Sequence, residues 1–118
     1  MPAQSPAEQL RTLCLALPEA IEQETWERPT YRVRAKIFAI EVVQAGRPAF
    51  WCKAQPGSQQ ILVGADAARF FVPPYFGPKG WVGMWIDRKP DWREVAELVR
   101  RSYRLVAPKK LVAKLDQS

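Results

Sequence analysis

The chain has 118 residues, 47% apolar and 25% charged, which predicts one globular domain over residues 1–118 and argues against intrinsic disorder. Its net charge of +6 favours an acidic partner, and the absence of histidine excludes Ser-His and Cys-His nucleophile pairs. No apolar run reaches the ~18 residues that a membrane span needs, and the first ten residues lack the basic and apolar regions typical of a signal peptide, so we expect a cytoplasmic protein without membrane contact.

The first predicted element is an amphipathic helix that begins at Ser5 and ends at Pro18. Ser5 can cap the helix, Pro6 suits its first position and Glu8 completes a capping box. Apolar residues follow at helical spacing: Leu10, Leu13, Cys14 and Leu17. Both Cys14 and Cys52, the second cysteine, are interpreted as buried small side chains.

Three strands are predicted next. They are a short one over residues 21–26, a long one over 31–43 and a return strand over 49–53, with a hairpin turn at Gln44–Arg47. In the return strand, Phe50 and Cys52 lie on one face and Trp51 and Lys53 on the other. We expect Trp26 and Trp51 to be the surface tryptophans.

A short helix is predicted from Ser58, followed by strands over residues 71–73 and 81–86, with a proline- and glycine-rich loop between them. The prolines at 73 and 74 end a strand, and Gly80 is expected at a positive φ angle. The segment "GPKG" is not a Walker A loop, because its lysine precedes the second glycine and a strand follows. Tyr75 and Lys79 remain candidates for ligand contact, although a solvated lysine is the ordinary alternative.

The last predicted helix begins at Asp91 and ends at Pro108, with a final basic turn or two after it. We expect this helix to cover the sheet face that carries Trp81 and Trp85. The element order is then α-β-β-β-α-β-β-α. It predicts an α+β domain with an antiparallel sheet of about five strands and helices packed on it.

Two long stretches carry a resemblance to a known family. "RFFVPPYFGPKGWVGMWID" with "DWREVAELVRRSYRLVAPKKL" is similar to the C-terminal part of the MmcQ/YjbR family, and "ERPTYRVRAKIFAI" resembles its "P-x-[FY]-x-V-x-x-K-x-F" stretch. The resemblance implies a small α+β fold of the double-wing, CyaY-like kind. Members of this family are commonly labelled DNA-binding, so the resemblance implies DNA binding as an expectation. No enzymatic activity is established for the family as a class.

The candidate nucleic-acid contacts begin with a row of cations of the same parity in one extended segment: Arg28, Arg32, Arg34 and Lys36. A bend near Ala35 is needed, because apolar residues take that parity afterwards. Tyr31, Trp26 and Tyr75 are the candidate stacking residues, and Lys53 and Lys79 add candidate phosphate contacts. A solvated edge strand is the structural alternative for this row.

No catalytic residue, metal ligand or cofactor-binding residue is predicted, since the carboxylate pairs are explained by strand position and by helical ion pairs. The sequence therefore favours a non-catalytic DNA- or other nucleic-acid-binding domain of low sequence specificity. The alternative is a protein-interaction or small-ligand-binding module with a pocket at the sheet face of Trp51 and Lys53. An enzyme is the third possibility.

Overall fold

A computed structural model describes residues 4–117, and its centre is one antiparallel sheet of six strands in the order β1-β2-β3-β4-β6-β5. The strands are β1 Ile21–Thr25, β2 Arg28–Val33, β3 Lys36–Gln44, β4 Arg47–Cys52, β5 Phe70–Phe71 and β6 Val82–Trp85. The helices are α1 Pro6–Leu15, α2 Ser58–Ala65, α3 Trp92–Val106 and α4 Lys109–Asp116, with a 3-10 turn at Gly77–Lys79. The α+β class with an antiparallel sheet is confirmed.

One long strand was predicted over residues 31–43, but the structure has two strands there, β2 and β3. Arg34 and Ala35 have φ angles of 50° and 68° and form a two-residue turn between β2 and β3. The same left-handed pair occurs at Trp26–Glu27 and at Ala45–Gly46, so β1 to β4 are joined by three tight hairpins. Four strands therefore precede α2, and the sheet has six strands where about five were predicted.

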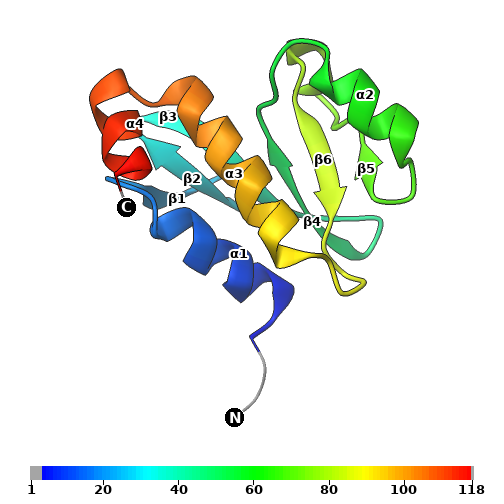
Figure 1. Ribbon diagram of the computed structural model, residues 1–118. Coiled ribbons are helices and arrows are strands. Elements are labelled where there is room, and N and C mark those ends of the chain that lie inside the picture. The colour runs from blue at the N-terminus through cyan, green and yellow to red at the C-terminus, as the bar shows by residue number, and fades with distance from the viewer. Residues whose placement is uncertain (1–3, 118) are drawn as a thin grey trace.

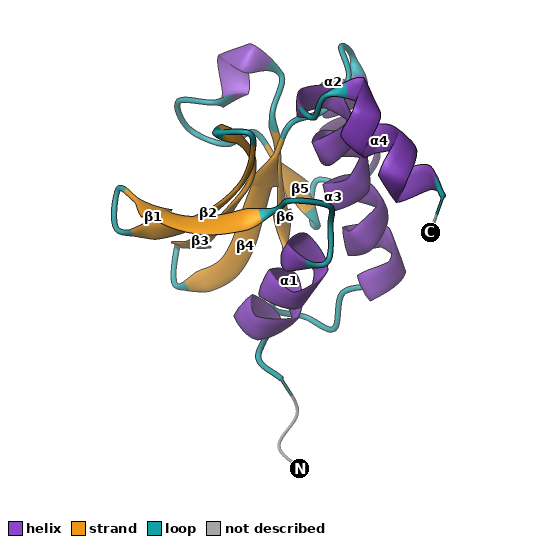
Figure 2. Cartoon of the chain, turned by 90° about the vertical axis from the view of Figure 1, so that its left-hand side faces the viewer, coloured by secondary structure: helices purple, strands orange, loops and turns teal. Residues whose placement is uncertain are grey.

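Helices α1 and α3 cover one face of the sheet, as the views in Figures 1 and 2 show. The core between these layers includes Phe38, Phe50 and Tyr103, which are almost fully buried. Ser102 of α3 joins the layers. Its Oγ donates to the carbonyl of Phe38 at 2.6 Å and accepts the amide of Lys53 at 2.9 Å.

A second, smaller apolar cluster lies on the opposite face of the sheet and contains Ile40, Val42, Ala49, Trp51 and Trp81. Two predictions are corrected here. Trp51 is buried, at 2% exposure, and is not a surface residue. Trp81 and Trp85 lie in this second cluster, because strand parity places them opposite the β6 residues that pack under α3.

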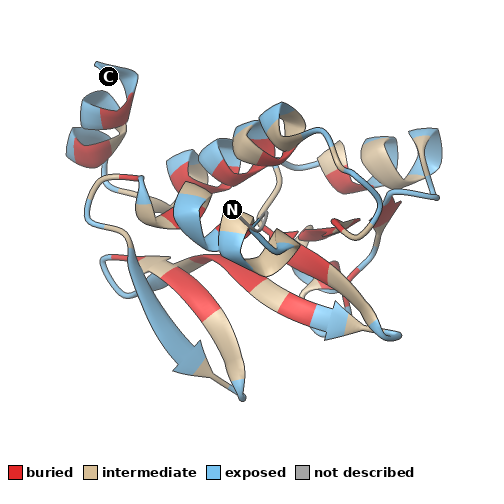
Figure 3. Cartoon of the chain, turned by 90° about the horizontal axis from the view of Figure 1, so that it is seen from below, coloured by how far each residue is buried: buried red, intermediate tan, exposed pale blue. Residues whose placement is uncertain are grey.

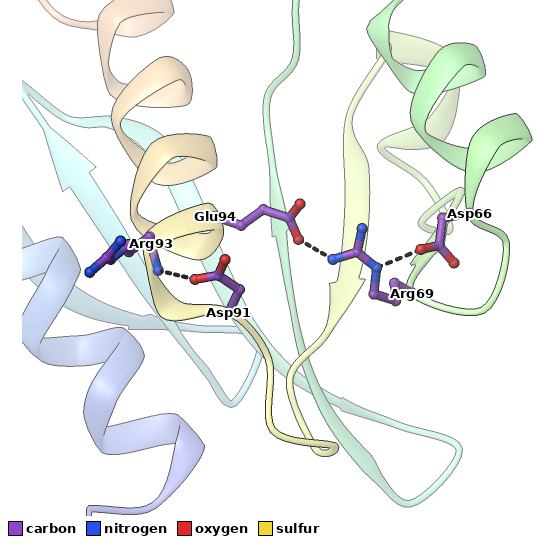
Figure 4. Close-up of polar contacts among 5 residues, drawn as sticks. All are labelled: Asp66, Arg69, Asp91, Arg93 and Glu94. Atoms are coloured by element: carbon purple, nitrogen blue, oxygen red, sulfur yellow. Dashed lines mark hydrogen bonds and ion pairs between the residues drawn. The ribbon is translucent and has the colours of Figure 1, made fainter.

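Ion pairs attach α2 and β5 to the first turn of α3 (Figure 4). The guanidinium of Arg69 binds Asp66 at 2.6 Å and also binds Glu94 of α3. Asp91 caps α3 through the amide of Arg93 at 3.0 Å, as the sequence predicts. No helix among the described residues is both long and apolar enough to cross a membrane.

Candidate aromatic pocket

The candidate site is a hollow of about 570 Å³, called here the aromatic pocket and lined by Trp26, Arg28, Trp51, Tyr75, Phe76 and Lys79. Three segments that are far apart in the chain build it. The β1–β2 hairpin supplies Trp26 and Arg28, β4 supplies Trp51, and the loop between β5 and β6 supplies the other three residues. The pocket lies at the cluster of buried residues on the sheet face away from α1 and α3.

Phe76 is the centre of the ring system. Its ring centroid lies 6.2 Å from that of Trp26, 6.0 Å from that of Trp51 and 4.8 Å from that of Trp81. These separations are those of tilted and edge-to-face aromatic pairs. The edge contact between Trp26 and Phe76 brings the hairpin and the loop together across one side of the pocket.

Two cations belong to the pocket, and each lies over an aromatic ring. The Arg28 guanidinium is 5.1 Å from the Trp51 ring centroid, and the Lys79 ammonium is 5.6 Å from that of Phe76. Neither side chain forms an ion pair within residues 4–117, so both charges are available to a ligand. Aromatic cages without cations suit ammonium ligands, whereas these two cations favour an anionic ligand with a planar ring.

Trp26 and Tyr75 are exposed, and both have backbone conformations that are unfavourable for bulky residues. Trp26 is 65% exposed with a φ of 54°, and Tyr75 is 87% exposed with a φ of 65°. A bulky residue at such a φ costs free energy, and asparagine or glycine would fit both turns better. Strained residues of this kind concentrate at functional sites.

The loop that carries Tyr75, Phe76 and Lys79 is held from beneath by Gln59 of α2. The buried side-chain amide of Gln59 donates to the carbonyl of Gly77 at 2.9 Å and to that of Trp81 at 2.6 Å. Gly80 ends the 3-10 turn with a φ of 84°, so the predicted positive φ is confirmed. All proline peptide bonds among the described residues are trans. The loop is therefore a fixed wall of the pocket.

Four of the nine predicted site residues meet in this pocket: Trp26, Arg28, Tyr75 and Lys79. Phe76 was missed because alternation in a proline-rich loop does not show which ring points inward. Gln59 was missed because a polar residue on a short helix looks solvated. Trp51 and Lys53 were predicted to share the pocket of the alternative function, but Trp51 lines the aromatic pocket and the half-buried Lys53 lines another hollow.

The other five candidates lie elsewhere. Tyr31 is 1% exposed and packs in the core under the helices, so the prediction that it stacks on a base is wrong. The prediction that the cations form a row on one face of a single strand is also wrong, because the turn at Arg34–Ala35 interrupts the strand. Arg34 pairs with Glu19 at 2.8 Å, while Arg32 donates to Thr25, Thr30 and the carbonyl of Ala35. Lys36 is exposed at the start of β3.

Lys53 lies at a second, smaller hollow of about 150 Å³ between α2 and α3. Ile61, Leu62 and Leu98 give this hollow an apolar lining, and Arg101 adds a second cation. Arg101 is paired with Glu97 at 3.0 Å on the same helix. Lys53 and the aromatic pocket therefore belong to different parts of the surface.

The cysteines offer no reactive thiolate. Burial raises the pKa of the Cys52 thiol to about 12 and also raises the pKa of Cys14, so both stay protonated at neutral pH. Both are free thiols in the core. Across residues 4–117, no three His, Cys, Asp or Glu side chains come together as a metal site.

Comparison with known proteins gives two findings. The YjbR family model matches residues 15–105, and no curated protein matches the chain. Among solved structures, the chain is similar to protein DR2400 of Deinococcus radiodurans, described as a domain of unknown function, DUF419. That likeness covers 97% of this chain and 92% of the other, with a TM-score of 0.77 and 23% sequence identity. At that identity it supports the fold alone.

Proposed function

The chain belongs to the YjbR family, and from that premise we propose that it is a non-catalytic nucleic-acid-binding domain of low sequence specificity whose aromatic pocket accepts an unpaired base. The observation that carries the proposal is that one pocket combines two exposed aromatic rings, Trp26 and Tyr75, with two cations that have no carboxylate partner among the described residues, Arg28 and Lys79. Rings supply stacking surfaces for a base, and the two cations supply contacts to phosphate.

Low specificity follows from the composition of the pocket. Every base has a π face, so stacking on tryptophan and tyrosine does not select a sequence. Apart from the two cations and the Tyr75 hydroxyl, the polar side-chain groups of the lining residues are the indole Nε1–H donors of Trp26 and Trp51, and that of Trp51 is buried without a hydrogen-bond partner. The pocket thus lacks the set of donors and acceptors that direct base readout requires.

The proposal also requires that single strands bind better than duplexes, because a paired base is stacked inside its helix and cannot enter a pocket without flipping. Fluorescence anisotropy with single-stranded and duplex DNA of the same sequence tests this requirement. Tyr75→Ala should weaken binding to the single strand by about 1–3 kcal/mol and change the weaker duplex binding little. Absence of binding of any DNA at low ionic strength would reject the function.

A second candidate function is the binding of a small organic anion with a planar ring. This candidate is favoured because many of the cations outside the pocket are already neutralised by carboxylates. Six arginines, at positions 11, 34, 47, 69, 101 and 104, are already paired with carboxylates among the described residues. Quenching of the tryptophan fluorescence by aromatic anions, together with absence of DNA binding, would favour this candidate.

A further inference from the structure

The side chains that line the aromatic pocket offer many hydrogen-bond donors and almost no acceptors. Four of the six lining side chains can only donate, namely those of Trp26, Arg28, Trp51 and Lys79. A fifth, the side chain of Phe76, has no polar atom. The Tyr75 hydroxyl is therefore the one lining side-chain group that can also accept a hydrogen bond. The carboxylates closest to Trp26 in the chain, those of Glu24 and Glu27, do not line the pocket.

The backbone of the pocket loop adds little acceptor capacity, because several of its carbonyls are already bonded. The carbonyl of Phe76 accepts the amide of Lys79 at 3.1 Å and that of Trp81 at 3.3 Å. The carbonyl of Gly77 accepts one amide of the 3-10 turn at 2.9 Å and the side chain of Gln59 at 2.9 Å. A carbonyl oxygen has two lone pairs, so neither of these two groups has one left for a ligand.

Donors occur both at the exposed and at the buried parts of the pocket. The hairpin that carries Trp26 lies at the edge of the sheet, and its strand β1 is exposed over most of its length (Figure 3). Trp26 itself is 65% exposed. Trp51, in contrast, is buried, and its Nε1–H has no hydrogen-bond partner among the described residues. A ligand ring that enters this pocket is therefore surrounded by donors.

Nucleobases differ in the exocyclic groups that such a pocket would contact. Thymine and uracil carry two carbonyl oxygens, which accept hydrogen bonds, whereas adenine, cytosine and guanine each carry an amino group, which donates them. An amino group that enters a pocket of donors loses its hydrogen bonds with water and gains none. Resting on the proposed function, we infer that the aromatic pocket prefers thymine or uracil to the three bases that bear an amino group. Sequence specificity stays low, since the preference concerns base composition and not base order.

Two single strands of equal length, one of deoxyuridine and one of deoxycytidine, test the inference. Their bases differ only in the group on C4, a carbonyl or an amino group, and in the proton on N3. In anisotropy titrations the deoxyuridine strand should bind at least about fivefold more tightly. Equal affinities, or tighter binding of the deoxycytidine strand, would overturn the inference and leave the proposed function intact. Binding of neither strand at low ionic strength would reject both.

Mononucleotides separate the chemistry of the ring from the properties of the strand, since stacking and flexibility also give single strands modest preferences. Deoxyuridine 5′-monophosphate should displace a labelled strand at a concentration at least about fivefold lower than deoxycytidine 5′-monophosphate does. A ratio near one would overturn the inference, because the preference of the strands would then come from their own stacking. Displacement near the dissociation constant of the strand would identify a free nucleotide as a sufficient ligand, and displacement only at much higher concentration would identify the strand.

Two substitutions at Lys79 provide a matched test of the donor set. Lys79→Gln and Lys79→Met remove the same charge and have side chains of similar length, but only glutamine supplies an acceptor, its amide oxygen. Both variants should weaken the binding of both strands, because both remove a cation from the pocket. Lys79→Met should keep the preference for deoxyuridine, whereas Lys79→Gln should reduce it to less than about threefold. Equal preferences in the two variants would show that the lack of acceptors does not set the ratio and would overturn the inference.

Discussion

At the scale of single residues, Trp26 shows a conflict between the demands of the backbone and those of binding. Its φ of 54° places it at the first central position of a tight hairpin, where asparagine or glycine is preferred. Trp26→Asn should therefore leave the free energy of unfolding unchanged or raise it by up to about 1 kcal/mol. The same variant should weaken single-strand binding by about 1–3 kcal/mol, because it removes an exposed stacking surface. Thermal melts and anisotropy titrations measure the two effects.

Ala45→Asn is the control for Trp26→Asn. Ala45 has the same φ of 54° in the β3–β4 turn and precedes Gly46, so the variant creates the favoured Asn-Gly pair away from the pocket. It should stabilise the fold and leave binding unaffected. A large loss of stability in Trp26→Asn alone would mean that Trp26 is a packing residue and not a binding residue.

Glu41 is expected to make stability depend on pH in the direction opposite to most carboxylates. Burial raises its pKa above the ordinary 4.5, and the neighbouring charge of Glu22 raises it further. Between pH 4.5 and this raised pKa, the folded state holds a proton that the unfolded state has lost. The free energy of unfolding therefore falls as pH rises through this range.

The variant Glu41→Gln should accordingly be more stable than the wild type near neutral pH, by up to about 1 kcal/mol. The gain should vanish below about pH 4, where Glu41 is protonated in both states. Chemical denaturation across this pH range measures the difference. A constant difference at every pH would point to packing instead of ionisation.

Single residues also show how far sequence could predict the site. Tyr75 and Lys79 were predictable because a loop of prolines and glycines between strands presents its other side chains outward. Tyr31 was predicted wrongly because its ring was proposed to stack for its nearness to the cations, although strand parity already placed it with Val33 on the face opposite to them. That face packs under the helices, so the ring is buried.

At the scale of elements, α2 matters because it supports the pocket loop through one side chain. Gln59→Met keeps the size of the side chain and removes both hydrogen bonds, which leaves the carbonyls of Gly77 and Trp81 without that donor. We expect a loss of about 1–3 kcal/mol in stability and weaker binding at the pocket, seen as a higher dissociation constant for single-stranded DNA.

Gln60→Met is the matched control for Gln59→Met, since Gln60 is the exposed neighbour on the same helix. It should change neither quantity. If Gln59→Met lowers the melting temperature but leaves the dissociation constant unchanged, then α2 stabilises the fold without shaping the pocket.

Strand β6 is fitted to β5 through Gly83. A Cβ atom added at Gly83 would collide with the ring of Phe71, which in turn stacks on Trp85 at 4.5 Å between ring centroids. Gly83→Ala should cost about 1–3 kcal/mol, the usual cost of overpacking. Gly64→Ala in α2 meets no atom within 4 Å and should be neutral or stabilising, so a pair of denaturant melts compares the two. Similar melts for both variants would show that Phe71 moves aside freely.

Elements were easier to predict than their connections. The N-cap at Ser5 is confirmed, with the Glu8 amide donating to the Ser5 hydroxyl at 3.1 Å, because capping is local chemistry. The Glu8 carboxylate accepts a hydrogen bond from the same hydroxyl at 3.1 Å. The Ala45–Gly46 turn is confirmed for the same reason. A bend near Ala35 was predicted from the change of parity, but a full two-residue turn was not, since Arg34 and Ala35 suit a strand and neither is the glycine or asparagine that usually marks such a turn.

At the scale of the whole molecule, the net charge of +6 is a poor guide to the site. Most of the described arginines neutralise carboxylates, and the basic residues of α3 and α4 belong to elements that do not line the pocket. The sequence could not show this, because ion pairs such as Arg47 with Asp87, 40 residues apart, depend on the folded topology. Net charge predicts attraction to an anion but not where it is bound.

The salt dependence of binding therefore distinguishes a pocket from a basic strip. If Arg28 and Lys79 are the only phosphate contacts, the logarithm of the association constant for a single strand should fall with log salt at a slope of about −1.4. Lys79→Ala should halve that slope, since one of two contacts is lost. Lys36→Ala is the control. It removes the same charge at the β2–β3 turn, outside the pocket, and should leave the slope unchanged. A slope of about −3 or steeper would require at least four contacts and would restore the row of Arg28, Arg32, Arg34 and Lys36 as the binding surface.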